Sequence, residues 1–178
     1  MVVALIGKLI NKGVSEYFLK VISVMEALGW EVVIEEELNA ALIAKCGIRE
    51  NHQTFSSHTD FKTGIDLTLS LGGDGTFLKS VSYIRDSGVP VLGINTGRLG
   101  FLANISKDTI EETIQAIYNK EYDFQRRSLL RVHTVEELFG DANFAMNELT
   151  VHKKDTSSMI TVHAALDNKY LNSYWADG

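Results

Sequence analysis

The stretch that most constrains the fold of this chain is Leu69–Leu78, where an apolar run ends in three glycines around one carboxylate and a helical pattern follows at once. A strand, a glycine turn and a helix in this order are typical of the carboxyl edge of a parallel α/β sheet, where such sheets bind their ligands. Because Gly72, Gly73 and Gly75 lack a Cβ, the backbone can approach a phosphate and offer it N–H groups. Asp74 would repel that phosphate unless it holds a metal ion or a hydroxyl about to react. The alternative is a glycine turn that serves packing alone.

The first two thirds of the chain alternate between strand and helix patterns. Apolar runs at 2–6, 30–34, 65–71 and 89–94 are interleaved with helical patterns at 14–28, 35–45, 76–86 and 106–119. This alternation predicts a parallel sheet wound on both faces. A second glycine-rich loop, 95–102, follows the run at 89–94, so both glycine loops are expected at one edge of the sheet. The polar segment 48–64 is expected to be a loop.

After Tyr122 the pattern changes to strands without intervening helices. Runs at 129–135, 144–151, 159–166 and 170–175 have strand patterns, with clear alternation of polarity at 159–166, and Asp167-Asn168 predicts a hairpin turn between the last two. We therefore expect an α/β domain over residues 1–123, Rossmann-like and doubly wound, and the beginning of an antiparallel β domain over 124–178.

Composition excludes several classes of function. The net charge of −6 argues against a general nucleic-acid binder. No run approaches the roughly 20 apolar residues of a membrane span. The single cysteine, Cys46, fits a reducing cytoplasm, where we expect the protein to be located. His52 and His58 could be metal ligands, but no cysteine or carboxylate stands at ligand spacing, and no metal site is predicted.

Three motifs together carry a resemblance to a known family. They are Gly72-Gly73-Asp74-Gly75-Thr76, then the run at 95–102 (Asn-Thr-Gly-Arg-Leu-Gly-Phe-Leu), then Asn147-Glu148. The first is neither a P-loop nor a G-x-G-x-x-G fingerprint. In this order the motifs resemble the bacterial NAD kinase family, whose members transfer the γ-phosphoryl of ATP, or of polyphosphate, to the 2′-hydroxyl of the adenosine ribose of NAD. The resemblance implies an ATP-dependent NAD kinase, with the second domain an all-β sandwich.

The resemblance also implies roles for residues of the first domain. Asp74 matches the family's base toward the ribose hydroxyl. Asp74 and Gly75 both match residues that contact NAD. Lys79 matches a basic position near the ligand. Phe101 is expected to pack near the nicotinamide or adenine, and Asn95 to order the second loop and contact the ligand.

In the second domain, Asn147 and Glu148 match a pair that hydrogen-bonds ribose hydroxyls and adenine, and Asp177 matches a ligand-contacting aspartate. Ser158 departs from the family, whose members often carry a basic residue or histidine there. The chain stops at Gly178, where family members continue with a ligand-binding segment and the rest of the sandwich. The resemblance thus implies a truncated sequence, from which we expect little or no kinase activity.

The expected substrates are NAD and ATP or polyphosphate, with Mg²⁺ carried by ATP and neither nucleic acid nor membrane as a partner. The full-length protein is expected to be a homodimer or homotetramer. Gly-Gly-Asp-Gly also occurs in lipid and sugar kinases, so such a kinase is one alternative. A non-catalytic nucleotide-binding module is the other.

Overall fold

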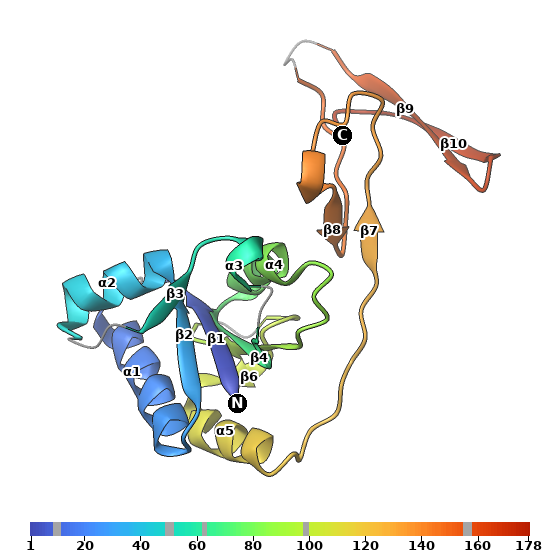
Figure 1. Cartoon of the computed structure of the whole chain (residues 1–178). Helices are drawn as coiled ribbons and strands as arrows, with labels where there is room; N and C mark the ends of the chain where they lie inside the picture. Colours follow the sequence, from blue (N-terminus) through green and yellow to red (C-terminus); the bar gives the residue numbers. More distant parts are fainter. Residues whose placement is uncertain (9–11, 49–51, 62–63, 98–99, 155–157) are drawn as a thin grey trace. The chain divides into compact units, whose positions relative to one another are not determined.

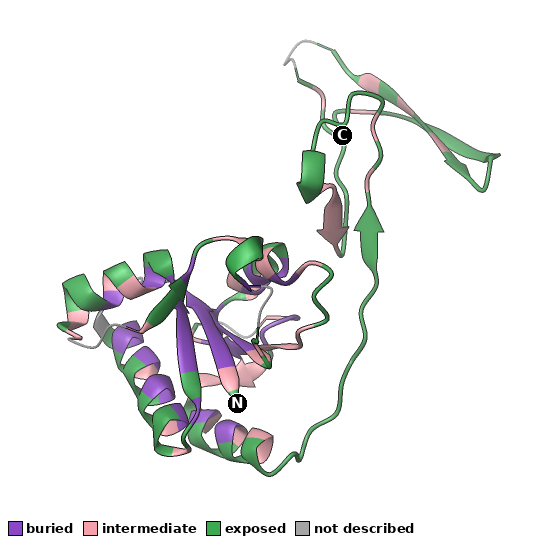
Figure 2. Cartoon of the chain, viewed as in Figure 1, coloured by how far each residue is buried: buried purple, intermediate pink, exposed green. Residues whose placement is uncertain are grey.

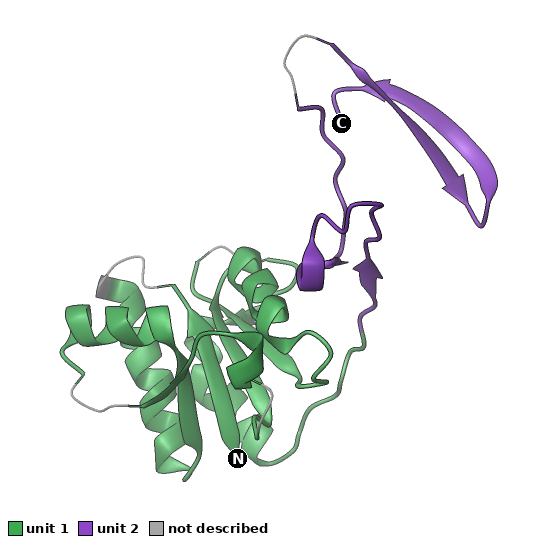
Figure 3. Cartoon of the chain, turned by 45° about the horizontal axis from the view of Figure 1, so that its top comes forward, with its two compact units in different colours: residues 1–126 green, residues 127–178 purple. Residues whose placement is uncertain are grey.

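A computed structural model describes residues 1–8, 12–48, 52–61, 64–97, 100–154 and 158–178. The chain divides into two compact units, 1–126 and 127–178 (Figure 3), and each is described by itself. The predicted domain boundary after residue 123 stays a prediction. The division of the chain into compact units falls between Arg126 and Arg127.

Unit 1 is built on a six-stranded parallel sheet in the order β3-β2-β1-β4-β5-β6 (Figure 1). The order changes direction between β1 and β4, which makes the crevice at their carboxyl ends the topological switch point of the sheet. The predicted doubly wound α/β class is confirmed. The strands are β1 (Val2–Gly7), β2 (Glu31–Glu35), β3 (Gln53–Phe55), β4 (Leu67–Gly72), β5 (Val91–Asn95) and β6 (Ile105–Ser106).

Helices cover both faces of this sheet. They are α1 (Lys12–Ala27), α2 (Glu36–Cys46), α3 (His58–Phe61), α4 (Asp74–Ile84) and α5 (Ile110–Tyr118), the last preceded by the 3₁₀ turn η1 (Lys107–Thr109). Successive residues of β1 point to opposite faces, so Val3 and Leu5 join the core under α1, α2 and α5. Ala4 and Ile6 join the core under α3 and α4 on the other face (Figure 1). The continuous apolar pattern of β1 follows from burial on both faces.

The prediction of a loop over 48–64 is wrong for its described part. Residues Gln53–Phe55 form β3, an edge strand paired with β2, and His58–Phe61 form α3. The polar residues of this segment concealed two buried aromatic side chains, Phe55 and Phe61, whose rings pack edge-to-face against each other. The hypothesis that His52 and His58 bind a metal finds no support, because His58 Nδ1 lies 2.6 Å from the carbonyl oxygen of Tyr83.

Replacing Phe61 by alanine is expected to lower the free energy of unfolding of unit 1 by about 3–5 kcal/mol, since it deletes a buried ring and leaves a cavity. Phe61 is 0% exposed, and its ring also packs against Tyr83. Urea unfolding followed by far-ultraviolet circular dichroism measures the change. Phe124→Ala is the matched control, because Phe124 is 69% exposed. Equal effects of the two substitutions would show that α3 adds nothing to the core.

Unit 2 consists of antiparallel β pairs. β7 (Leu129–Arg131) pairs with β8 (Phe144–Met146), with the 3₁₀ turn η2 (Gly140–Ala142) between them, and β9 (Ile160–Leu166) pairs with β10 (Lys169–Ala176). The predicted hairpin turn is confirmed: Asp167 and Asn168 both have positive φ, as a tight two-residue turn requires. None of the described residues of unit 2 is buried, whereas most residues of β1, β2 and β4 in unit 1 are (Figure 2).

Candidate active site

The glycine turn lies between β4 and α4, at the carboxyl edge of the sheet. Gly73 is the extended residue before α4, and its carbonyl accepts hydrogen bonds from the backbone of Thr76 and Phe77. A Cβ added at Gly73 or Gly75 would meet no atom within 4 Å. These two glycines are therefore not required by packing inside the protein, and the open space above them is available to a ligand.

Asp74, the first residue of α4, points to the neighbouring loop after β5. Its Oδ2 accepts a hydrogen bond from the backbone N–H of Phe101 at 2.9 Å. Its Oδ1 accepts two more, from Leu102 and Ala103, each at 3.0 Å. The register that pairs Gly72 with Asn95 brings the two loops together. One carboxylate therefore joins the two glycine motifs of the sequence.

These three donors keep Asp74 ionised. The N–H groups of Ala103, then Phe101 and Leu102, hold the pKa of the Asp74 carboxyl below its ordinary value of 3.8, because they bind the charged form. The position at the start of a helix favours the same charge. Asp74 is thus a fixed anion at neutral pH.

This lowered pKa predicts how stability depends on pH. A group with a lower pKa in the folded state stabilises the fold above its unfolded pKa, and the contribution is lost as pH falls through the folded pKa. Between pH 5 and about pH 3 the urea midpoint of Asp74→Asn should consequently fall less steeply than that of the wild type. Urea titrations at each pH measure this, and parallel slopes would contradict it.

Asn95 and Gly100 fix the second loop in two different ways. Asn95 is buried, its Nδ2 donates to the carbonyl of Ala103 at 3.2 Å, and its Oδ1 accepts from the N–H of Gly97 at 2.7 Å. A Cβ on Gly100 would overlap the Asp74 carboxylate, lying 2.6 Å from its Cγ and 2.8 Å from its Oδ2. The loop can come this close to Asp74 only because residue 100 has no side chain.

Phe101 presents its ring to the surface. The side chain is 93% exposed, which excludes core packing within unit 1, while its N–H is held by Asp74. Such a ring is available for contact with a planar ligand group. Arg98 and Leu99, which belong to the second motif, lie outside the described residues.

A cavity of about 540 Å³ opens at the switch point of the sheet. Its walls come from the end of β1, the first half of α2 and the start of α4, and they include Lys8, Glu37, Gly73, Gly75 and Lys79. The turn thus presents its glycines to this cavity and the Asp74 carboxylate to the loop after β5.

Lys79 is paired with protein carboxylates. Its Nζ lies 2.5 Å from Glu35 Oε1 and 2.9 Å from Glu37 Oε2. The same Glu35 oxygen accepts a hydrogen bond from the hydroxyl of Tyr83 at 2.8 Å. Burial and the neighbouring Glu35 carboxylate raise the pKa of Tyr83 to about 12, so its hydroxyl stays protonated and donates.

The remaining predicted site residues belong to unit 2. Asn147 and Glu148 follow β8 and are exposed, with Asn147 in the left-handed region at φ 75°. Asp177 follows β10, and its Oδ1 lies 2.5 Å from Lys153 Nζ. The Lys153 N–H also donates to the Asp177 carbonyl at 3.0 Å, so Asp177 is bound to Lys153 through both its main chain and its side chain.

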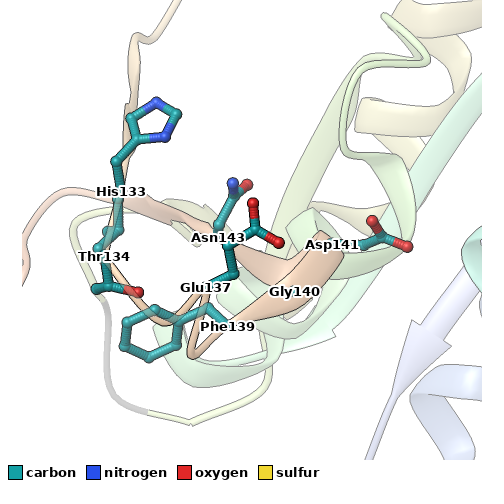
Figure 4. A pocket seen from close by; sticks show the side chains of 8 residues that line it. His133, Thr134, Glu137, Phe139, Gly140, Asp141 and Asn143 are labelled. Carbon is teal, nitrogen blue, oxygen red and sulfur yellow. The ribbon is translucent and has the colours of Figure 1, made fainter.

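A second cavity, of about 290 Å³, lies within unit 2 at the loop that connects β7 to β8 (Figure 4). Residues of one loop line it, including His133, Glu137, Phe139 and Asn143, while the Asp141 carboxylate points away from Glu137 and Asn143. None of the predicted site residues lines it. It therefore adds nothing to the candidate site.

Two features of the site were not predicted from the sequence: the contact of Glu35 with Lys79, and the close approach of Gly100 to Asp74. Glu35 was expected to begin a helix, but it is the last residue of β2 and is 1% exposed. The usable signal was an acidic residue ending an otherwise apolar strand. Gly100 stood in the quoted motif, but no sequence pattern could show that its neighbour is Asp74.

Comparison with known proteins identifies the family. Residues 3–122 match the model of the ATP-NAD kinase N-terminal domain. The chain belongs to the NAD kinase family. It is 42% identical to the NAD kinase of Flavobacterium psychrophilum over 180 residues, covering 100% of this chain and 61% of that protein. It is 47% identical to the NAD kinase of Flavobacterium johnsoniae over 150 residues, covering 83% and 51%.

The fold has a counterpart among solved structures. Yeast NADH kinase, determined in complex with NADH, superimposes with a TM-score of 0.80 at 20% sequence identity, over 99% of this chain and 55% of that one. This likeness shows a shared fold. The chain spans about 60% of the length of the F. psychrophilum relative. Among the described residues no helix is long and apolar enough to cross a membrane.

Proposed function

We propose that the protein containing this chain is an NAD kinase that transfers the γ-phosphoryl of ATP, or of polyphosphate, to the 2′-hydroxyl of the adenosine ribose of NAD. The observation that carries the proposal is the Asp74 carboxylate, fixed by three backbone N–H groups next to glycines that face open space. Family membership supplies the substrate class.

The geometry of Asp74 suits a residue that orients a hydroxyl and accepts its proton. A carboxylate offers about four lone-pair sites, and the three N–H bonds leave about one for a substrate hydroxyl. Its lowered pKa makes it a weak base. A weak base is sufficient where the transition state of phosphoryl transfer is loose, because positioning and charge stabilisation then dominate the catalysis.

Gly75 offers its backbone to the ligand at the start of α4, and Phe101 offers its exposed ring. Lys79 is proposed to bind the ligand at the cavity, and Asn95 is proposed to act by ordering the second loop. Asn147, Glu148 and Asp177 are proposed to bind the ribose and adenine of NAD.

Mg²⁺ is proposed to enter with ATP. No group of three or more His, Cys, Asp or Glu side chains in the described part of the chain could hold a metal ion. Mg²⁺ in nucleotide sites is commonly held mainly by substrate phosphates and water, which is the mode proposed here. When bound, the ion neutralises charge on the phosphates.

A cytoplasmic location and a homodimeric or homotetrameric state belong to the same proposal. The lone, half-buried Cys46 supports the first. Exposed apolar side chains of β10, among them Tyr174 and Trp175, support the second.

A substrate panel tests the function. The longest natural form of the protein that contains these residues is incubated with MgATP and, in turn, NAD, a diacylglycerol, a sphingoid base and fructose 6-phosphate. The proposal predicts phosphorylation of NAD alone. Phosphorylation of a lipid or sugar, with NAD unchanged, would assign the glycine motif to a different kinase.

A further inference from the structure

The cavity at the switch point contains a lysine with two unlike carboxylate partners. Lys79 is held by Glu35 on one side and by Glu37 on the other. Glu35 is 1% exposed, whereas the Glu37 side chain is 83% exposed and lines the cavity itself. The two partners come from the end of β2 and the first turn of α2.

Glu35 cannot release Lys79 without large cost. Its Oε1 bonds to Lys79 and to Tyr83, while its Oε2 is buried and has no hydrogen-bond partner among the described residues. A buried carboxylate that loses its cation is left as an uncompensated charge in a poorly solvated site. The contact therefore fixes the position of the ammonium group.

Glu37 can release Lys79 readily. A solvent-exposed ion pair contributes little, because water replaces the partner. The hydrogen bond and the positive charge of Lys79, and more weakly the charge of Lys8, lower the pKa of the Glu37 carboxyl, so Glu37 is an anion bound to the Lys79 ammonium group. Lys8, Glu37 and Lys79 all line the same cavity, as do Gly73 and Gly75 at the start of α4.

We propose that Glu35 positions Lys79 at the cavity and that Glu37 is an internal counter-ion of Lys79, which the phosphate chain of a ligand displaces. The ligand class is a tri- or polyphosphate, free or as part of a nucleotide. The inference rests on the proposed function in assigning the phosphoryl donor to this cavity, but its test requires no turnover.

The test measures binding of inorganic tripolyphosphate and of MgATP to the longest natural form of the protein that contains these residues, by isothermal titration calorimetry. Glu37→Gln should bind tripolyphosphate about two- to fivefold more tightly than the wild type, the range expected for removing one exposed competing charge. Glu36→Gln is the matched control, since it removes the same charge from the same exposed helix turn. It should change the affinity by much less.

Two further variants separate this account from a general charge effect. In a Lys79→Met background the gain from Glu37→Gln should shrink to the small effect of Lys8. Glu35→Gln should weaken binding, and circular dichroism shows whether that variant folds. The decisive comparison, Glu37→Gln against Glu36→Gln, involves no buried residue. Equal effects of those two, a gain that persists fully without Lys79, or no binding by either the wild type or Glu37→Gln would each overturn the inference.

This result is distinguishable from failure of the proposed function. If the protein makes NADP but Glu37→Gln has no larger effect on binding than Glu36→Gln, only the counter-ion role of Glu37 is refuted. If the variants bind tripolyphosphate with the predicted differences but the protein makes no NADP, only the kinase assignment is refuted.

Discussion

Asp74→Asn is expected to lower the rate of NADP formation by about 10²- to 10⁴-fold, the range typical of removing a positioned acid–base group. The substitution removes the negative charge and replaces one acceptor oxygen by a donor. Asparagine cannot accept all three N–H bonds that Asp74 now receives from residues 101–103. The rate should therefore fall through the chemistry and also through loosening of the second loop. NADP is measured with an NADP-specific dehydrogenase.

Asp60→Asn is the matched control for this loss. Asp60 also accepts backbone N–H bonds, from Ser56 and Ser57, and its pKa is also lowered by them. It lies at α3 and lines neither cavity. Activity should survive Asp60→Asn. If Asp74→Asn retained most of the activity, the role of Asp74 as proton acceptor would be wrong.

Gly100→Ala is expected to cost about 10²-fold in kcat, the order of effect known for a displacement of about 1 Å at a reacting group. The new Cβ would overlap the Asp74 carboxylate, with Cγ only 2.6 Å away. Either Asp74 turns away or the loop withdraws, and both outcomes break the hydrogen bonds to residues 101–103. Hydrogen exchange of those three amides should rise together with the loss of rate.

Gly97→Ala separates crowding at Asp74 from a general intolerance of the loop. It is the same substitution in the same loop, but its Cβ would lie 3.9 Å from the nearest atom, Asn95 Oδ1, which is an ordinary contact. The Gly97→Ala variant should keep near-normal activity, and the hydrogen exchange of amides 101–103 should stay as slow as in the wild type. Equal losses in the two variants would show that the close approach to Asp74 is not the cause.

The sequence predicted the parts of the fold that follow from local pattern. The alternation of apolar strands and helices defined the parallel sheet, and two glycine loops after neighbouring strands were expected at one edge, as observed for Gly72 and Asn95. Strand β3 and helix α3 were not predicted. Among the described residues of that polar segment, Phe55 and Phe61 alone are fully buried in the core, and two side chains make no recognisable period.

Contacts between side chains from distant segments were beyond sequence reasoning. Lys79 was expected near a ligand, but its pairing with Glu35 depends on β2 ending beside the start of α4. The hydrogen bonds from the backbone of residues 101–103 to Asp74 likewise depend on the register between β4 and β5. Asn147, Glu148 and Asp177 were named through resemblance alone, and their ligand contacts stay predictions.

The most direct test of the central claim is the appearance of NADP from NAD and MgATP, catalysed by the longest natural form of the protein that contains these residues. We predict that NADP and ADP form in equal amounts, that the new phosphate is on the 2′-hydroxyl of the adenosine ribose, and that Asp74→Asn slows the formation of both by about 10²- to 10⁴-fold. Folded protein that yields ADP without NADP, or neither product, would contradict it.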